Sequence, residues 1–118
     1  YELTSELGYS EWEGKLFGIG NTEVAGFILE DWRFPQEIID GIKNHHLLND
    51  ESYSSYLACV LNLAGNIVQQ LGLSLPGEHR LWEVSLRKLG NVSLSGDQLA
   101  EASEQTRVRF ERQRSALS

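Results

Sequence analysis

Two adjacent histidines, His45 and His46, are the residues whose types and spacing could do chemistry in this sequence. An imidazole can bind a transition metal or act as a general acid or base near neutral pH. Neighbouring helical residues point about 100° apart, so the two rings cannot readily close on one ion, and at most one of them is a ligand. The pair therefore belongs either to a polar pocket or to a hydrogen-bonded structural pair that helps to end a helix.

The patterns of the common catalytic and metal sites are absent from the sequence. It has no HExxH, CxxC, GxSxG or phosphate-binding loop in a supporting context. A single cysteine, Cys59, excludes an internal disulfide and a multi-cysteine zinc site. No basic neighbour stabilises its thiolate, so we expect a small buried side chain. We assign no catalytic, cofactor-binding or metal-binding residue, and no cofactor.

The charge of the chain is uneven. Residues 1–51 hold eleven acids and three bases, whereas residues 52–118 hold six acids and seven bases. An acidic first half argues against nucleic-acid binding, because phosphate contacts need clustered Lys and Arg. The arginines between 107 and 114 fit a solvated helix end. No window approaches the roughly 18 apolar residues of a membrane span, so we expect a soluble protein with no membrane partner, placed by default in the cytoplasm.

Helical periodicity runs through nearly every segment and predicts an all-α fold, a helical bundle of about five to six helices. The expected helices cover about 10–17, 21–32, 35–46, 52–71, 78–89 and 95–114. Asn21 is the expected N-cap of its helix. Spacing at i, i+3, i+4 and i+8 predicts one buried face made by Val24, Phe27, Ile28 and Trp32. At 100° per residue, His45 and His46 flank the buried face of Ile38, so the pair is at least partly inward.

The second half of the chain carries three further expectations. The helix 52–71 should be central and bury a stripe of Leu57, Leu61, Ala64, Val68 and Leu71, which Val60, Leu63 and Ile67 widen. The helix 78–89 should bury Trp82, Leu86 and Leu89. Ser95 and Gln98 form the capping-box signature of a last helix, whose thin apolar face of Leu99, Ala102 and Phe110 either packs loosely or docks on another domain.

Two segments of the chain carry a family resemblance. LFGIGNTEVAGFILEDWRFPQEIIDGIKNHH (Leu16–His46), followed by YLACVLNLAGNI (Tyr56–Ile67), resembles the second half of an HDOD domain. HDOD domains are non-catalytic helical modules related to the HD and HD-GYP metal-dependent phosphohydrolases. The resemblance implies that residues 1–72 form the C-terminal half of an HDOD-like domain. Residues 73–118 would then be trailing helices that pack on the same core.

The departures from the family pattern concern two positions. Asn21 stands where the wider family commonly has a histidine, and Gly65 stands where it commonly has an aspartate. A divalent cation would thus lose one nitrogen ligand and one carboxylate. The resemblance therefore implies a vestigial pocket without a cofactor, and its candidate residues are Asn21, His45, His46 and Gly65.

The resemblance implies a non-enzymatic regulatory or protein-interaction module of a bacterial-type signal transduction protein. Its partners would be other signalling domains of the same or a partner protein, and the acidic first half or the thin last helix would be the contact surface. A homodimer is one way to cover apolar surface that half a domain leaves open. The alternative is an HD-type metal-dependent phosphohydrolase acting on a nucleotide or phosphoester, with His45 or His46 as ligand or base and the other ligands upstream of Tyr1.

Overall fold

The computed structural model describes residues 7–117. This part of the chain is all-α, as predicted, with no strand among the described residues. Two short 3₁₀ helices, η1 and η2, accompany the six α-helices. In chain order the elements are α1 (Tyr9–Phe17), α2 (Asn21–Asp31), α3 (Gln36–Asn44), η1 (Asp50–Ser54), α4 (Tyr56–Gln70), η2 (His79–Trp82), α5 (Leu86–Asn91) and α6 (Gly96–Leu117). Residues 1–6 of the first predicted unit lie outside the described part.

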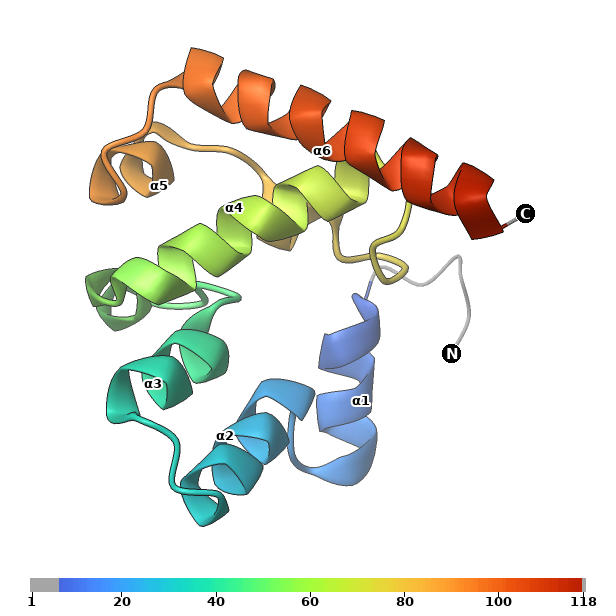
Figure 1. Ribbon diagram of the computed structural model, residues 1–118. Coiled ribbons are helices and arrows are strands. Elements are labelled where there is room, and N and C mark those ends of the chain that lie inside the picture. The colour runs from blue at the N-terminus through green and yellow to red at the C-terminus, as the bar shows by residue number, and fades with distance from the viewer. Residues whose placement is uncertain (1–6, 118) are drawn as a thin grey trace.

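The helices are arranged around α4, which crosses the middle of the molecule (Figure 1). α3 contacts α2 on one side and α4 on the other, so these three helices form a continuous stack. α6 runs across the opposite side of α4, and its C-terminal end points away from α2 (Figure 1). No helix within residues 7–117 is both long and apolar enough to cross a membrane.

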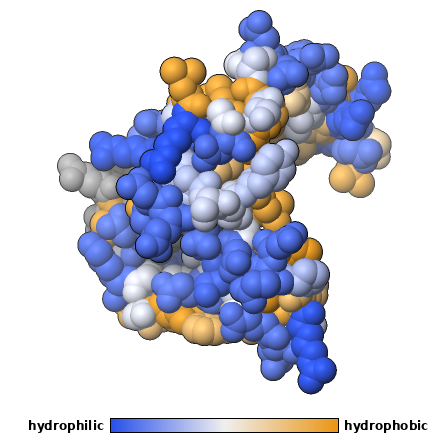
Figure 2. All heavy atoms as spheres, turned by 90° about the vertical axis from the view of Figure 1, so that its left-hand side faces the viewer, coloured by the Kyte–Doolittle hydropathy of each residue, from blue (hydrophilic) through white to orange (hydrophobic). Residues whose placement is uncertain are grey.

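The buried face of α2 is the opposite of the predicted one. Gly26 is the buried residue of this helix, and a Cβ atom built on it would lie 2.5 Å from Cγ of Lys43, so α2 approaches α3 through its smallest side chain. The predicted face of Val24, Phe27, Ile28 and Trp32 is exposed instead. Apolar atoms are visible along the lower edge of the molecule, at the height of α2 (Figure 2). The prediction was wrong because periodicity finds an apolar face but does not say whether a neighbour covers it.

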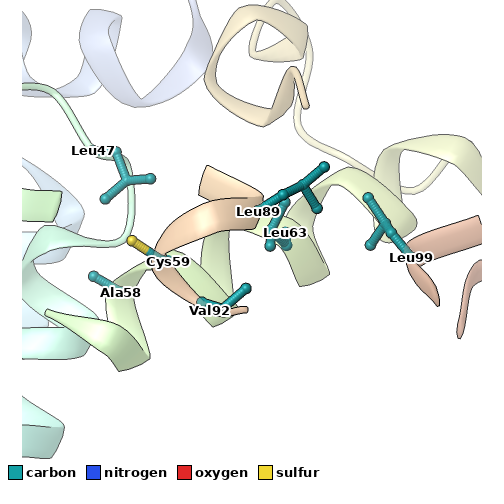
Figure 3. Close-up of a cluster of buried hydrophobic side chains, with 7 residues drawn as sticks. All are labelled: Leu47, Ala58, Cys59, Leu63, Leu89, Val92 and Leu99. Atoms are coloured by element: carbon teal, nitrogen blue, oxygen red, sulfur yellow. The ribbon is translucent and has the colours of Figure 1, made fainter. Parts of the chain in front are cut away.

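The hydrophobic core lies between α4, α5 and the first turn of α6 (Figure 3). Its members are Leu47, Ala58, Cys59, Leu63, Leu89, Val92 and Leu99. Cys59 is fully buried, which confirms the expectation for the single cysteine. The cluster contains side chains from both predicted units, residues 1–72 and residues 73–118.

The central helix starts later than predicted and buries only part of the predicted face. α4 begins at Tyr56, because the Ser55 hydroxyl accepts a hydrogen bond from the Ala58 N–H at 3.1 Å and caps the helix there. Residues 50–54 form η1 instead. The buried residues of α4 are Ala58, Cys59, Asn62 and Leu63, whereas Ala64 and Val68 of the predicted stripe are exposed. Small and polar residues form much of this inward face, because backbone atoms of neighbouring segments, and not only their side chains, pack against α4 there.

The predicted helix 78–89 is two short helices separated by extended backbone. Glu83 has a ψ of 135°, and the Ser85 side chain caps α5 by accepting the Lys88 N–H at 3.2 Å. Trp82 and Leu89 are buried as expected, but Leu86 is 89% exposed. The helix breaks because carbonyl groups that it would use internally bind side chains of α4 and α5 instead.

The start of the last helix is as predicted. The Gln98 N–H donates to the Ser95 hydroxyl at 3.1 Å, and the Ser95 N–H donates to the Gln98 side-chain oxygen at 2.9 Å. This reciprocal pair is a capping box. α6 then continues to Leu117.

Candidate functional site

All four residues of the predicted vestigial pocket line one small pocket of about 270 Å³. Asn21 is the first residue of α2, His45 and His46 follow α3 directly, and Gly65 lies in the middle of α4. Three separate helices thus bring them together. Trp82, at the end of η2, forms another wall of the pocket.

The two histidines and Trp82 form an aromatic cluster. The ring of His45 stacks on Trp82 with centroids 6.0 Å apart and planes tilted by 21°. The ring of His46 meets Trp82 edge-on at 5.5 Å, and the two imidazoles are 4.7 Å apart. Both histidines are half-buried, which confirms that the pair is partly inward.

Trp82 lies against the backbone of Gly65. A Cβ atom built on Gly65 would lie 2.4 Å from Cε3 of the indole, a distance that real Cβ atoms essentially never show. An aspartate at this position would need the indole to move away. The indole ring therefore occupies the space into which an aspartate side chain at this position would project.

Two asparagines of α4 position the backbone around this cluster. Asn62 is fully buried, and its Nδ2 donates to the carbonyls of His45 at 2.8 Å and Leu81 at 2.9 Å. Asn66 Nδ2 donates to the carbonyl of Trp82 at 2.8 Å. Asn62 precedes Gly65 by three residues and Asn66 by four, so the three lie on one side of α4. Sequence reasoning missed both asparagines; the signal was a polar residue inside an apolar stripe.

His45 already uses one ring nitrogen. Its Nδ1 lies 2.6 Å from the carbonyl oxygen of Ile42. Because a carbonyl can only accept, Nδ1 carries the proton. His45 thus helps to end α3 by binding one of its last free carbonyls, which is the structural role considered for the histidine pair.

His46 is a weak base in this environment. Burial, together with the neighbouring His45, lowers the pKa of His46 from 6.5 to about 4. Its imidazole is therefore uncharged at neutral pH. It lines both the pocket beside Trp82 and an adjoining cleft of about 500 Å³.

Asn21 belongs to a hydrogen-bond chain that ends on Glu78. Its Nδ2 donates to the hydroxyl of Ser10 at 2.9 Å and to Oε1 of Glu13 at 3.1 Å. The Ser10 hydroxyl in turn donates to Glu78 Oε1 at 2.6 Å, and the Ser10 N–H donates to the same oxygen. The prediction of Asn21 as an N-cap was wrong: Gly20 is the N-cap of α2, and the amide ties α2 to α1 instead.

Glu78 is buried, with 2% of its surface exposed. It fixes α1 to the segment before η2, 68 residues along the chain. No local pattern could have linked Ser10 with Glu78, so the sequence did not reveal this contact. The hydrogen-bond chain from Asn21 to Glu78 therefore has a structural role.

The described part of the chain contains no group of three or more His, Cys, Asp or Glu side chains that could hold a metal ion. The pocket instead combines aromatic rings, an amide and the Glu78 carboxylate, which already accepts two hydrogen bonds from Ser10. Its chemistry is that of packing and hydrogen bonding.

A second candidate surface is the exposed side of α1 and α2. Phe17 and Val24 border one shallow depression of about 360 Å³, and the rings of Trp32 and Phe34 lie 6.4 Å apart. We use the name α1–α2 apolar face for these exposed side chains of α1, α2 and the segment after α2: Phe17, Val24, Phe27, Ile28, Trp32 and Phe34. Phe27 is 58% exposed and Trp32 is 66% exposed, so neither ring belongs to the core.

Comparison of the chain with protein-family models, with curated proteins and with solved structures finds no match. Its own residues and their geometry therefore carry the functional argument.

Proposed function

We propose that this chain is a non-enzymatic protein-interaction module with a regulatory role, as its resemblance to HDOD domains implies. The observation that carries the proposal is the α1–α2 apolar face, where aromatic rings as large as those of Phe27 and Trp32 remain exposed. Large exposed apolar surfaces on soluble domains mark sites of interaction. Phe and Trp are also among the residues enriched at protein interfaces.

The environment of the histidine pair supports the same proposal. A metal ligand must present a neutral nitrogen with a free lone pair, and a general base also needs a pKa near the working pH. The Nδ1–H of His45 binds the Ile42 carbonyl, which leaves Nε2 as its one possible acceptor, and the pKa of His46 falls to about 4. Both rings pack around Trp82, and the described residues contain no group of three or more His, Cys, Asp or Glu side chains that could hold a metal ion.

The alternative function is an HD-type metal-dependent phosphohydrolase whose other ligands lie upstream of Tyr1. The observation that favours it is the convergence of Asn21, His45 and His46 on one pocket. In that case one imidazole would serve as ligand or base. The two functions differ in what the histidines do, which an experiment can separate.

The first test is a hydrolysis assay on the full-length protein. It is purified without chelators, analysed for bound metal and assayed on p-nitrophenyl phosphate and bis-p-nitrophenyl phosphate with Mn²⁺, Mg²⁺ or Fe²⁺. We expect no bound metal and equal background rates for the wild type and for the His45→Asn, His46→Gln double variant. Metal-dependent hydrolysis that the double variant loses would instead establish the enzyme.

The second test asks whether the α1–α2 apolar face contributes to folding. We expect the double variant Phe27→Ser, Trp32→Ser to change the free energy of unfolding by less than about 0.5 kcal/mol, because removing an exposed side chain leaves no buried cavity. The control, Leu63→Ser in the buried core, should cost several kcal/mol, on the order of 3. A comparable cost at Phe27 and Trp32, measured by urea denaturation, would make this face part of the core and contradict the proposal.

A further inference from the structure

The apolar stripe of α6 extends beyond the part of the helix that packs on the molecule. Leu99, Phe110 and Leu117 lie within about 20° of one another around the helix axis, at 100° per residue. Leu99 is buried in the core, Phe110 is half-buried, and Leu117 is 87% exposed. Phe110 is therefore only partly covered, with the Arg114 guanidinium 5.6 Å from its ring centroid, and the stripe becomes uncovered towards Leu117.

The second half of α6 is also basic. Residues 107–117 contain four arginines and one glutamate, which gives a charge of +3. Arg107 and Arg114 lie on one side of the Phe110 stripe and Arg109 lies on the other, whereas Arg112 points away, at about 200° from Phe110. Arg107 pairs with Glu104 and Glu111, but Arg109 forms no ion pair with any described residue.

The segment that carries the α1–α2 apolar face has the complementary charge. Residues 7–34 hold five acids and two bases, which gives −3. On α2, Asp31 lies between Phe27 and Ile28, since it follows them by four and three residues, and Glu23 and Glu30 lie along the Phe27 edge. Glu13 borders the depression between Phe17 and Val24.

We propose, building on the proposed function, that the second half of α6 in one copy of this chain binds the α1–α2 apolar face of another copy. The apolar stripe around Phe110 covers Phe27 and Ile28, and the arginines on its two sides meet the carboxylates of α2. An amphipathic helix laid along an apolar surface is a recurrent mode of recognition. Within one copy the C-terminal end of α6 points away from α2 (Figure 1). Reciprocal exchange between two copies closes the dimer.

The pairing is tested by reversing the charges on one side at a time. One variant carries Glu30→Arg and Asp31→Arg, whose new cations suit the C-terminal turn of α2. The other carries Arg109→Glu and Arg114→Glu. We expect the wild type to dimerise in sedimentation equilibrium, and each variant to dimerise at least roughly tenfold more weakly because its own two surfaces now repel. Circular dichroism checks that both variants fold.

Mixing the two variants is the decisive measurement. In a mixed dimer both contacts join opposite charges again, so we expect the mixture to regain the wild-type affinity. Arg112→Glu, on the far side of α6, and Glu37→Arg, on α3, are the controls and should leave dimerisation unchanged. A wild type that stays monomeric up to roughly 0.1 mM, a mixture that fails to associate, or an equal loss in the controls would overturn the pairing.

The dimerisation experiment and the hydrolysis assay can fail separately, so they distinguish the pairing from the proposed function. A monomeric wild type without metal-dependent hydrolysis removes this pairing and leaves the interaction module with a different partner. Hydrolysis that depends on His45 and His46 removes the proposed function, whatever the state of association.

Discussion

At the scale of single residues, Gly65 and Trp82 decide what the candidate pocket can be. The indole takes the space beside the Gly65 backbone, and both histidines pack against the indole. The family resemblance implied that Asn21, His45, His46 and Gly65 belong to one pocket, and all four line it. The sequence did not show that Trp82 lies over Gly65, because the two residues are 17 positions apart and separated by a turn and a linker.

Replacing Gly65 tests this packing directly. We expect Gly65→Ala to lower the free energy of unfolding by about 1–3 kcal/mol, the cost of inserting a methyl group into a filled space. Gly65→Asp should cost more, because it also buries a carboxylate against the indole. The control is Gly90→Ala in α5, where an added Cβ meets no atom within 4 Å and better helix propensity should be neutral or stabilising. A Gly65→Ala protein as stable as the control in urea denaturation would contradict the placement of Trp82.

At the scale of elements, local signals were reliable at helix ends and unreliable for buried faces. The capping box at Ser95 and Gln98 forms as predicted, because its hydrogen bonds join residues three positions apart. The large apolar face of α2 is exposed, because α2 packs through Gly26. The break at Glu83 was missed, because its cause is a set of tertiary hydrogen bonds from Asn62, Asn66 and Lys88.

Removing the capping box should weaken the start of α6 specifically. We expect Ser95→Ala to lower the free energy of unfolding by about 1 kcal/mol, since the Gln98 N–H loses the hydroxyl that accepts its hydrogen bond. Ser95→Asp should retain most of the stability, because a carboxylate can accept the same bond and suits a helix N-terminus. Thermal denaturation followed by circular dichroism compares the variants. Equal stability of the alanine and aspartate variants would show that the cap contributes little.

At the scale of the whole molecule, His46 makes stability depend on pH. Its pKa is about 4 in the folded protein, below the ordinary 6.5, so the unfolded state binds the proton more readily. The free energy of unfolding should be unaffected by this group above pH 6.5. It should fall as the pH drops from 6.5 towards 4, by at most about 1.4 kcal/mol per pH unit.

The His46→Gln variant isolates this contribution. We expect its stability to change less between pH 7 and pH 4.5 than that of the wild type, because glutamine does not titrate. His45→Asn is the companion variant, because it removes the charge of His45, which is the second cause of the lowered His46 pKa. An NMR titration in which the His46 ring protonates between pH 6 and 7 would contradict the argument.

The charges of the molecule are also separated in space. The acidic residues of α1 and α2 lie at one end of the molecule, and the arginines of α6 lie on a helix directed away from it (Figure 1). Such a separation favours contact between copies, and added salt should weaken it. Exposed apolar side chains also lie at these two places, among them Phe27 and Leu117, which is why the pairing uses both.

The sequence by itself determined the all-α class, the approximate positions of most helices, the burial of Cys59 and the capping of α6. The helices and the cap depend on interactions between residues a few positions apart, and the burial of Cys59 was predicted from its place in an apolar run. The tertiary structure decided which face of α2 and α4 is buried, where the segment 78–89 breaks, and that Trp82 covers Gly65. These depend on which surfaces meet across the chain, and periodicity carries no information about the identity of a helix's neighbour.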